Sequence, residues 1–104
     1  MDFNKLVRDR IPEIIKSNGD VPVTHIANDI EFEKALIAKL HEEVDEFIRK
    51  PSVEEMADIV EVLRAILVQN GIDFSLFEEI MSRKREERGG FLQKIILERT
   101  ENRK

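Results

Sequence analysis

The amino-acid sequence predicts a mainly all-α fold, a small helical bundle with a short two-stranded β-ribbon. Long stretches of the chain place apolar residues three and four positions apart, as an amphipathic helix does. Residue pairs that commonly end helices separate these stretches, at Asn18-Gly19, Lys50-Pro51 and Asn70-Gly71. Two short segments, 22–27 and 91–97, instead have the composition of strands.

The spacing of apolar residues and helix-ending residues predicts four helices, over residues 11–18, 30–49, 53–69 and 74–88. Pro12 is tolerated in the first turn of the first helix, where the missing amide would have no partner. We expect Asn28 or Asp29 to cap the second helix and Asp73 to cap the fourth. The Gly89-Gly90 pair is expected to end the fourth helix.

The two strand-like segments are predicted to pair with each other. PVTHIA (22–27) alternates and is rich in β-branched residues, which favours extended structure. FLQKIIL (91–97) is apolar and is bounded by glycines and charged residues. We therefore expect a ribbon at one end of the bundle, and a single domain over residues 1–104.

Composition excludes several classes of function. The net charge of −5 disfavours binding to nucleic acid, which needs a basic surface. The absence of cysteine excludes disulfides, zinc–thiolate sites and cysteine nucleophiles. The first ten residues are charged and lack the apolar run of a signal peptide, and no apolar run approaches about 20 residues, so we expect a cytoplasmic protein with no membrane partner. A chain of 104 residues has a small core, so we expect a homodimer or a higher homo-oligomer.

The stretch HEEVDEF (41–47) contains four carboxylates, and helical spacing divides them between two faces. At about 100° per residue, Glu43 and Glu46 fall roughly 20° and 80° from Leu36, beside the apolar side of the predicted helix. Asp45 falls on the opposite face and Glu42 points outward. Glu43 and Glu46 are therefore expected to border the core.

A second carboxylate pair is predicted on the following helix. Glu55 falls within the apolar side of residues 53–69, where an unpaired carboxylate is costly, and Asp58 lies about 60° away. Helices joined by a short turn run antiparallel, so Glu43 and Glu46 should face Glu55 and Asp58. Four adjacent carboxylates need a compensating positive charge, and an all-oxygen ligand set suits Mg²⁺ or Mn²⁺.

The same carboxylates also have a structural interpretation. Ser52-x-x-Glu55 matches a capping box, in which Glu55 reaches back to the amide of the cap residue. Lys39 precedes Glu43 by four residues and can pair with it on the helix surface, and Arg49 can pair with the next carboxylate. A purely structural role for the acidic residues therefore stays open at this point.

Basic residues gather near both ends of the chain, as Lys5, Arg8 and Arg10 and as Lys84, Arg85 and Arg88. Cations in the last turn of a helix are common because they oppose the helix dipole. As a set, these residues would also suit phosphate binding beside a metal ion, which is the usual arrangement for phosphoryl chemistry.

Four stretches in this order resemble one family. EEVDE (42–46) followed by EMAD (55–58) resembles the EExxE…ExxD signature of the MazG-like all-α nucleoside triphosphate pyrophosphatases. NKLVRDRIPEII (4–15) looks like the opening of a small branch of that superfamily labelled phosphoribosyl-ATP pyrophosphohydrolase-like, and KREERGGF (84–91) is similar to its closing motif. The resemblance covers about residues 3–97.

The resemblance implies a function and a set of roles. The implied function is Mg²⁺-dependent cleavage of the α–β phosphoanhydride of a nucleoside triphosphate, giving a monophosphate and pyrophosphate. The implied metal ligands are Glu43, Glu46, Glu55 and Asp58, with Glu43 or Glu46 as the catalytic carboxylate that orients or deprotonates water. The implied phosphate-binding residues are Lys84 and Arg88, with Lys5, Arg8 and Asp9 near the nucleotide. The implied fold is a helical bundle that works as a dimer or larger assembly.

Only eight residues (47–54) separate Glu46 from Glu55, fewer than is usual in the wider superfamily. This short spacing leaves the substrate open. House-cleaning of non-standard nucleotides, phosphoribosyl-ATP hydrolysis and a non-catalytic metal- or nucleotide-binding module all fit the carboxylate pattern.

Overall fold

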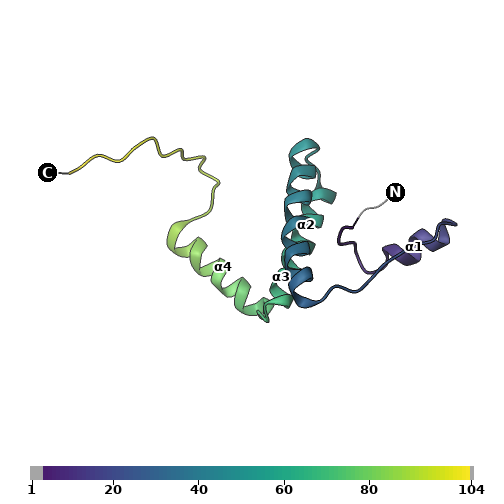
Figure 1. The fold of residues 1–104 in the computed structure, drawn as a ribbon. Coiled ribbons are helices and arrows are strands. Elements are labelled where there is room, and N and C mark those ends of the chain that lie inside the picture. The colour runs from purple at the N-terminus through teal and green to yellow at the C-terminus, as the bar shows by residue number, and fades with distance from the viewer. Residues whose placement is uncertain (1–3, 104) are drawn as a thin grey trace. The chain divides into compact units, whose positions relative to one another are not determined.

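The computed structural model describes residues 4–103, and this part of the chain contains four α-helices. In chain order these are α1 (Ile11–Ser17), α2 (Asp29–Arg49), α3 (Val53–Gln69) and α4 (Phe74–Arg88) (Figure 1). Each predicted helix is confirmed to within one residue at either end. The mainly all-α fold class is therefore confirmed.

The helix boundaries follow from local chemistry that the sequence displays. The backbone N–H of Glu31 donates to the Asn28 side chain at 2.9 Å, which satisfies an amide in the first turn of α2. Ser52 and Asp73 accept equivalent hydrogen bonds at 3.1 Å at the starts of α3 and α4. Gly89 follows α4 with a φ of 81°, a conformation that glycine adopts without steric cost.

The chain divides into two compact units, one ending at Gly71 and the other beginning at Ile72. The first unit contains α1, α2 and α3, and the second contains α4 and the C-terminal segment. The single domain over residues 1–104 stays a prediction.

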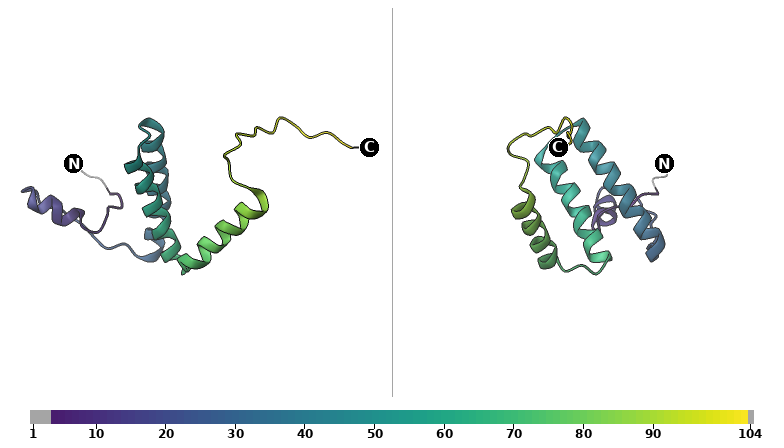
Figure 2. Two further views of the ribbon diagram at one scale, coloured as in Figure 1. Left: turned by 180° about the vertical axis from the view of Figure 1, so that it is seen from behind. Right: turned by 90° about the vertical axis from the view of Figure 1, so that its left-hand side faces the viewer.

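Within the first unit, α2 and α3 lie side by side as a hairpin (Figures 1 and 2). Pro51 in the short connection cannot continue α2, so the chain reverses there. Leu36 of α2 and Val62 and Leu67 of α3 are the most buried apolar residues, with exposed fractions of 3%, 8% and 9%. The hairpin core therefore holds both helices in a fixed register, which positions the acidic residues along its edge.

The predicted β-ribbon is wrong, because residues 4–103 contain no strand and both 22–27 and 91–97 are irregular. Val23, Ile26 and Phe91 are 96%, 95% and 98% exposed. β-Branched and apolar residues favour a strand mainly when neighbouring side chains cover them, and an isolated two-stranded ribbon is marginal in water. The composition of these segments therefore did not suffice to form a strand.

An apolar stripe runs along the exposed surface of the hairpin. It consists of Ile37, Val44 and Ile48 on α2 and Val53, Met56, Val60 and Leu63 on α3, all of them exposed. On each helix these residues are spaced by three, four or seven positions, so they share one face. None of the helices in residues 4–103 is both long and apolar enough to cross a membrane.

Candidate metal centre

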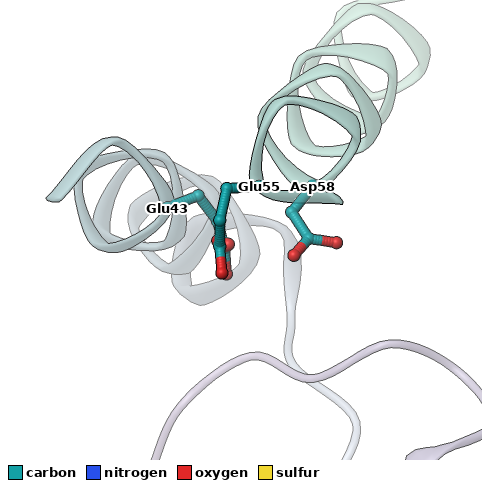
Figure 3. Close-up of side chains that lie close together, drawn as sticks. All are labelled: Glu43, Glu55 and Asp58. Carbon is teal, nitrogen blue, oxygen red and sulfur yellow. The ribbon is translucent and has the colours of Figure 1, made fainter. Parts of the chain in front are cut away.

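Three carboxylates converge on one edge of the α2–α3 hairpin. Glu43 comes from α2, and Glu55 and Asp58 come from the first turns of α3. One oxygen from each residue lies within 4.8 Å of the others. Figure 3 shows the Glu43 and Glu55 side chains pointing the same way, with the Asp58 carboxylate beside them. We refer to Glu43, Glu55 and Asp58 as the carboxylate trio.

Glu43 borders the core, as the helical spacing predicted. It is 8% exposed, which makes it the most buried charged residue described in the structure. The Lys39 ammonium lies 3.4 Å from its carboxylate, one turn earlier on α2, with a side chain only 17% exposed. The predicted surface pairing of Lys39 with Glu43 is therefore present, but the buried carboxylate also faces two others.

Glu55 takes part in the cap of α3 through its backbone and in the trio through its carboxylate. Its backbone N–H donates to the Ser52 hydroxyl at 3.1 Å, so the first half of the predicted capping interaction is formed. Its carboxylate lies with the oxygens of Glu43 and Asp58. The cap therefore anchors the start of α3 at the point where the Glu55 side chain meets its neighbours.

The surroundings of Glu55 favour the neutral form of its side chain. Desolvation raises the pKa of Glu55 above its usual value, and the charges of Asp58, Glu43 and Glu46 raise it further. Lys50 lowers the pKa but does not offset these effects. At Glu55, desolvation and the neighbouring carboxylates therefore outweigh the effect of Lys50.

Glu46, the fourth predicted ligand, lies outside the trio. Its carboxylate is 3.7 Å from the Arg49 guanidinium, which is the second of the predicted surface pairs. It is close enough to raise the pKa of Glu55, and its side chain is 44% exposed. Glu46 is therefore next to the trio and reachable by water.

Two cations from the N-terminal segment reach the acidic edge. Arg8 Nη2 donates to Asp58 Oδ1 at 2.6 Å, and Lys5 Nζ lies 3.6 Å from Glu42. Sequence reasoning placed Lys5 and Arg8 near a nucleotide but did not pair them with particular carboxylates. No sequence signal could have done so, because Arg8 and Asp58 are 50 positions apart. Glu42, expected to point outward, is half-buried and also accepts a hydrogen bond from Lys39 at 3.5 Å.

The remaining predicted residues lie elsewhere. Lys84 and Arg88 are exposed on α4, in the second unit, and are one helical turn apart. Asp9 is exposed in the turn before α1. Asp45 is exposed on α2, as predicted for the solvated face. The phosphate-binding roles of Lys84 and Arg88 stay predictions.

The chemistry of the trio fits a small, hard divalent cation. All three donors are carboxylate oxygens, which Mg²⁺ and Mn²⁺ prefer. Two oxygens on opposite sides of a Mg²⁺ ion lie about 4.2 Å apart, so the 4.8 Å spread closes with small side-chain rotations. A divalent cation would also offset the neighbouring negative charges, which add to desolvation in raising the pKa of Glu55.

Comparison with known proteins finds one partial relative at high identity. A protein of Mycolicibacterium smegmatis, described as uncharacterized, is 55% identical over 42 residues. The match covers 40% of this chain and 43% of that protein, so it spans less than half of either. No family model matches the chain, and no solved structure matches it.

Proposed function

We propose that this chain is a Mg²⁺-dependent nucleoside triphosphate pyrophosphohydrolase of the MazG-like superfamily. One observation carries the proposal. Three of the four residues that the family motifs imply as metal ligands, on two different helices, have carboxylate oxygens within 4.8 Å of one another. Acidic side chains on a protein surface repel one another and tend to point apart. Here, by contrast, Glu43 is buried next to two other carboxylates.

The trio would hold the metal, with Mg²⁺ as the first candidate and Mn²⁺ as the second. A bound divalent cation supplies charge neutralisation for the triphosphate and lowers the pKa of a coordinated water. Mg²⁺ commonly keeps several water or phosphate ligands, so three carboxylates leave positions for a substrate. The trio therefore suits a site that binds the metal together with a nucleotide.

Glu46 is the best candidate for the carboxylate that orients and deprotonates the attacking water. It lies next to the trio without belonging to it, and its side chain is 44% exposed. Glu43, the other catalytic candidate, is better suited to a ligand role because it is buried among the ligands. Transfer of a proton from water to Glu46, with attack on the α-phosphorus, would release pyrophosphate and leave a nucleoside monophosphate.

Basic residues would neutralise the leaving pyrophosphate. Lys5 and Arg8 lie at the acidic edge of the hairpin, where they are candidates for this role. For Lys84 and Arg88, which share one face of α4, the family resemblance implies phosphate binding. Guanidinium and ammonium groups bind phosphate oxygens through charge-assisted hydrogen bonds. The substrate class is a nucleoside triphosphate or a related phosphoanhydride such as phosphoribosyl-ATP, and the proposed compartment is the cytoplasm.

The partner that we propose for the apolar stripe is a second copy of the chain. On the helical wheel of α3, Met56 and Asp58 lie about 160° apart, so the stripe and the trio occupy opposite flanks of the hairpin. Pairing through the stripe would bury its apolar side chains and leave the acidic edge open to solvent and substrate. A homodimer is therefore compatible with the proposed site.

The experiment that tests the function is a panel of nucleoside triphosphates with Mg²⁺, scored separately for pyrophosphate and orthophosphate. We expect pyrophosphate from at least one substrate, and loss of most activity in Glu43→Gln and Asp58→Asn. The matched controls are Asp45→Asn on α2 and Glu54→Gln on α3, which remove exposed carboxylates outside the trio. Release of orthophosphate alone, or full activity in both trio variants, would refute the proposal.

A further inference from the structure

The ion pair between Arg8 and Asp58 joins two distant parts of the chain. Arg8 belongs to residues 4–10, which contain no helix or strand and precede α1, and we call this segment the N-terminal strap. Arg8 Nη2 lies 2.6 Å from Asp58 Oδ1, the shortest ion pair described in the structure. The strap therefore contacts one member of the carboxylate trio directly.

The strap is held on the hairpin by more than one contact. Lys5 lies 3.6 Å from Glu42 of α2, whereas Arg8 pairs with Asp58 of α3. Leu6 and Val7, between these two cations, are half-buried. The strap therefore reaches both helices through ion pairs at the edge where the trio converges, and its two central apolar side chains are partly shielded from water.

The Asp58 carboxylate has room for two partners. A carboxylate offers two oxygens with about four lone-pair directions, so one oxygen can accept from Arg8 while the other serves a different group. Figure 3 shows one Asp58 oxygen turned toward Glu43 and Glu55 and the other turned away from them. The trio already brings its oxygens within 4.8 Å while Asp58 is paired with Arg8.

We propose that Arg8 is a positioning residue of the metal centre, which holds the Asp58 carboxylate so that an oxygen faces Glu43 and Glu55. This inference rests on the proposed function, because it assumes that the trio binds a divalent cation. The side chain of Asp58 is 38% exposed, so packing alone leaves it free to rotate. A guanidinium hydrogen bond restricts that rotation, and partners of this kind are typically worth about 10- to 100-fold in metal affinity.

The positive charge of Arg8, considered alone, would change the metal affinity in the opposite direction. A positive charge near a cation site repels the metal, so removal of Arg8 would tighten metal binding if Arg8 only competed with it. If Arg8 instead orients Asp58, its removal weakens metal binding. The sign of the change in affinity therefore separates the two roles.

The test is calorimetric titration of Mg²⁺ into the full chain, without nucleotide, for the unsubstituted protein, Arg8→Ala, Arg8→Lys and Asp58→Asn. Arg10→Ala is the matched control, because Arg10 lies in the same strap but pairs with the exposed Glu13 at 3.5 Å. The Tm of each variant in EDTA reports whether loss of an ion pair has only changed stability.

We expect Arg8→Ala to weaken Mg²⁺ binding about tenfold and Arg8→Lys to weaken it less, because lysine keeps the charge but loses the planar two-donor group. Arg10→Ala should bind Mg²⁺ like the unsubstituted chain. Equal or tighter Mg²⁺ binding by Arg8→Ala, with Asp58→Asn impaired, would overturn the positioning role and leave the proposed function standing. An unsubstituted chain that binds no Mg²⁺ without nucleotide would overturn the positioning role, and the nucleotide panel would still decide the proposed function.

Discussion

Replacement of Val60 by glutamate should separate the proposed dimer into single chains. Val60 lies in the middle of the apolar stripe and is 59% exposed. Burial of a side chain of this size is worth about 1.5–3 kcal/mol when complete, so burial of the exposed fraction is worth about 0.9–1.8 kcal/mol per copy. In a twofold dimer each substitution occurs twice, which gives about 1.8–3.5 kcal/mol and a dimer Kd weakened about 20- to 400-fold.

The introduced charge adds to this loss, because a carboxylate buried at an interface without a partner is strongly unfavourable. The assay is analytical ultracentrifugation over a range of protein concentrations, with circular dichroism to confirm that the helices remain. Val68→Glu is the matched control, since Val68 lies on the same helix and is 73% exposed, but sits about 100° from the centre of the stripe. A single-chain mass for the unsubstituted protein, or equal dissociation by both variants, would refute the reasoning.

Three further variants test the hairpin. Leu36→Ala removes the most buried side chain of α2, so it should lower the free energy of unfolding by about 2–5 kcal/mol in a urea titration, whereas Ile30→Ala, at a 71% exposed position, should have little effect. Ser52→Ala removes the cap of α3 and should cost about 1 kcal/mol, measured as a lower Tm. Glu55→Gln should change the pH dependence of stability in EDTA. Folding raises the pKa of Glu55, so the folded chain binds a proton at Glu55 more tightly than the unfolded chain does. The resulting stabilisation of the folded chain is complete below the pKa of the unfolded state. It is lost as the pH rises through the pKa of the folded state. The glutamine variant should therefore lose less stability than the unsubstituted chain as the pH rises above about 4.5, the ordinary pKa of a glutamate, and an identical pH profile would contradict this explanation.

The sequence was most informative where a single local interaction decides the structure. The starts of α2, α3 and α4 follow from Asn28, Ser52 and Asp73, because each side chain satisfies an amide in the helix that it precedes. The angle of about 100° per residue placed Glu43 beside the core, because the angle between two residues of a helix depends only on their separation in the sequence.

The sequence was least informative where distant residues have to meet. The prediction of a β-ribbon was wrong because a β-branched composition specifies neither a pairing partner nor neighbours that cover the side chains. The contact between Arg8 and Asp58 is non-local in the same way, since no periodicity connects a strap to a helix 50 positions later. Glu46 shares a helix edge with Glu43, but one further turn is enough to place it outside the trio and beside Arg49.

The balance of charge within the trio indicates why a cation is expected there. Arg8 lies 2.6 Å from Asp58 and Lys39 lies 3.4 Å from Glu43, but Lys39 is shared with Glu42. Within residues 4–103, neither of these two ion pairs includes Glu55, and Glu55 is the member of the trio whose pKa is raised. Glutamine at this position would remove the repulsion and keep the backbone cap to Ser52, so a purely structural role of Glu55 does not require its charge. A divalent cation at the trio would supply positive charge beside Glu55, where the neighbouring carboxylates outweigh Lys50, and this is the physical basis for proposing metal binding there.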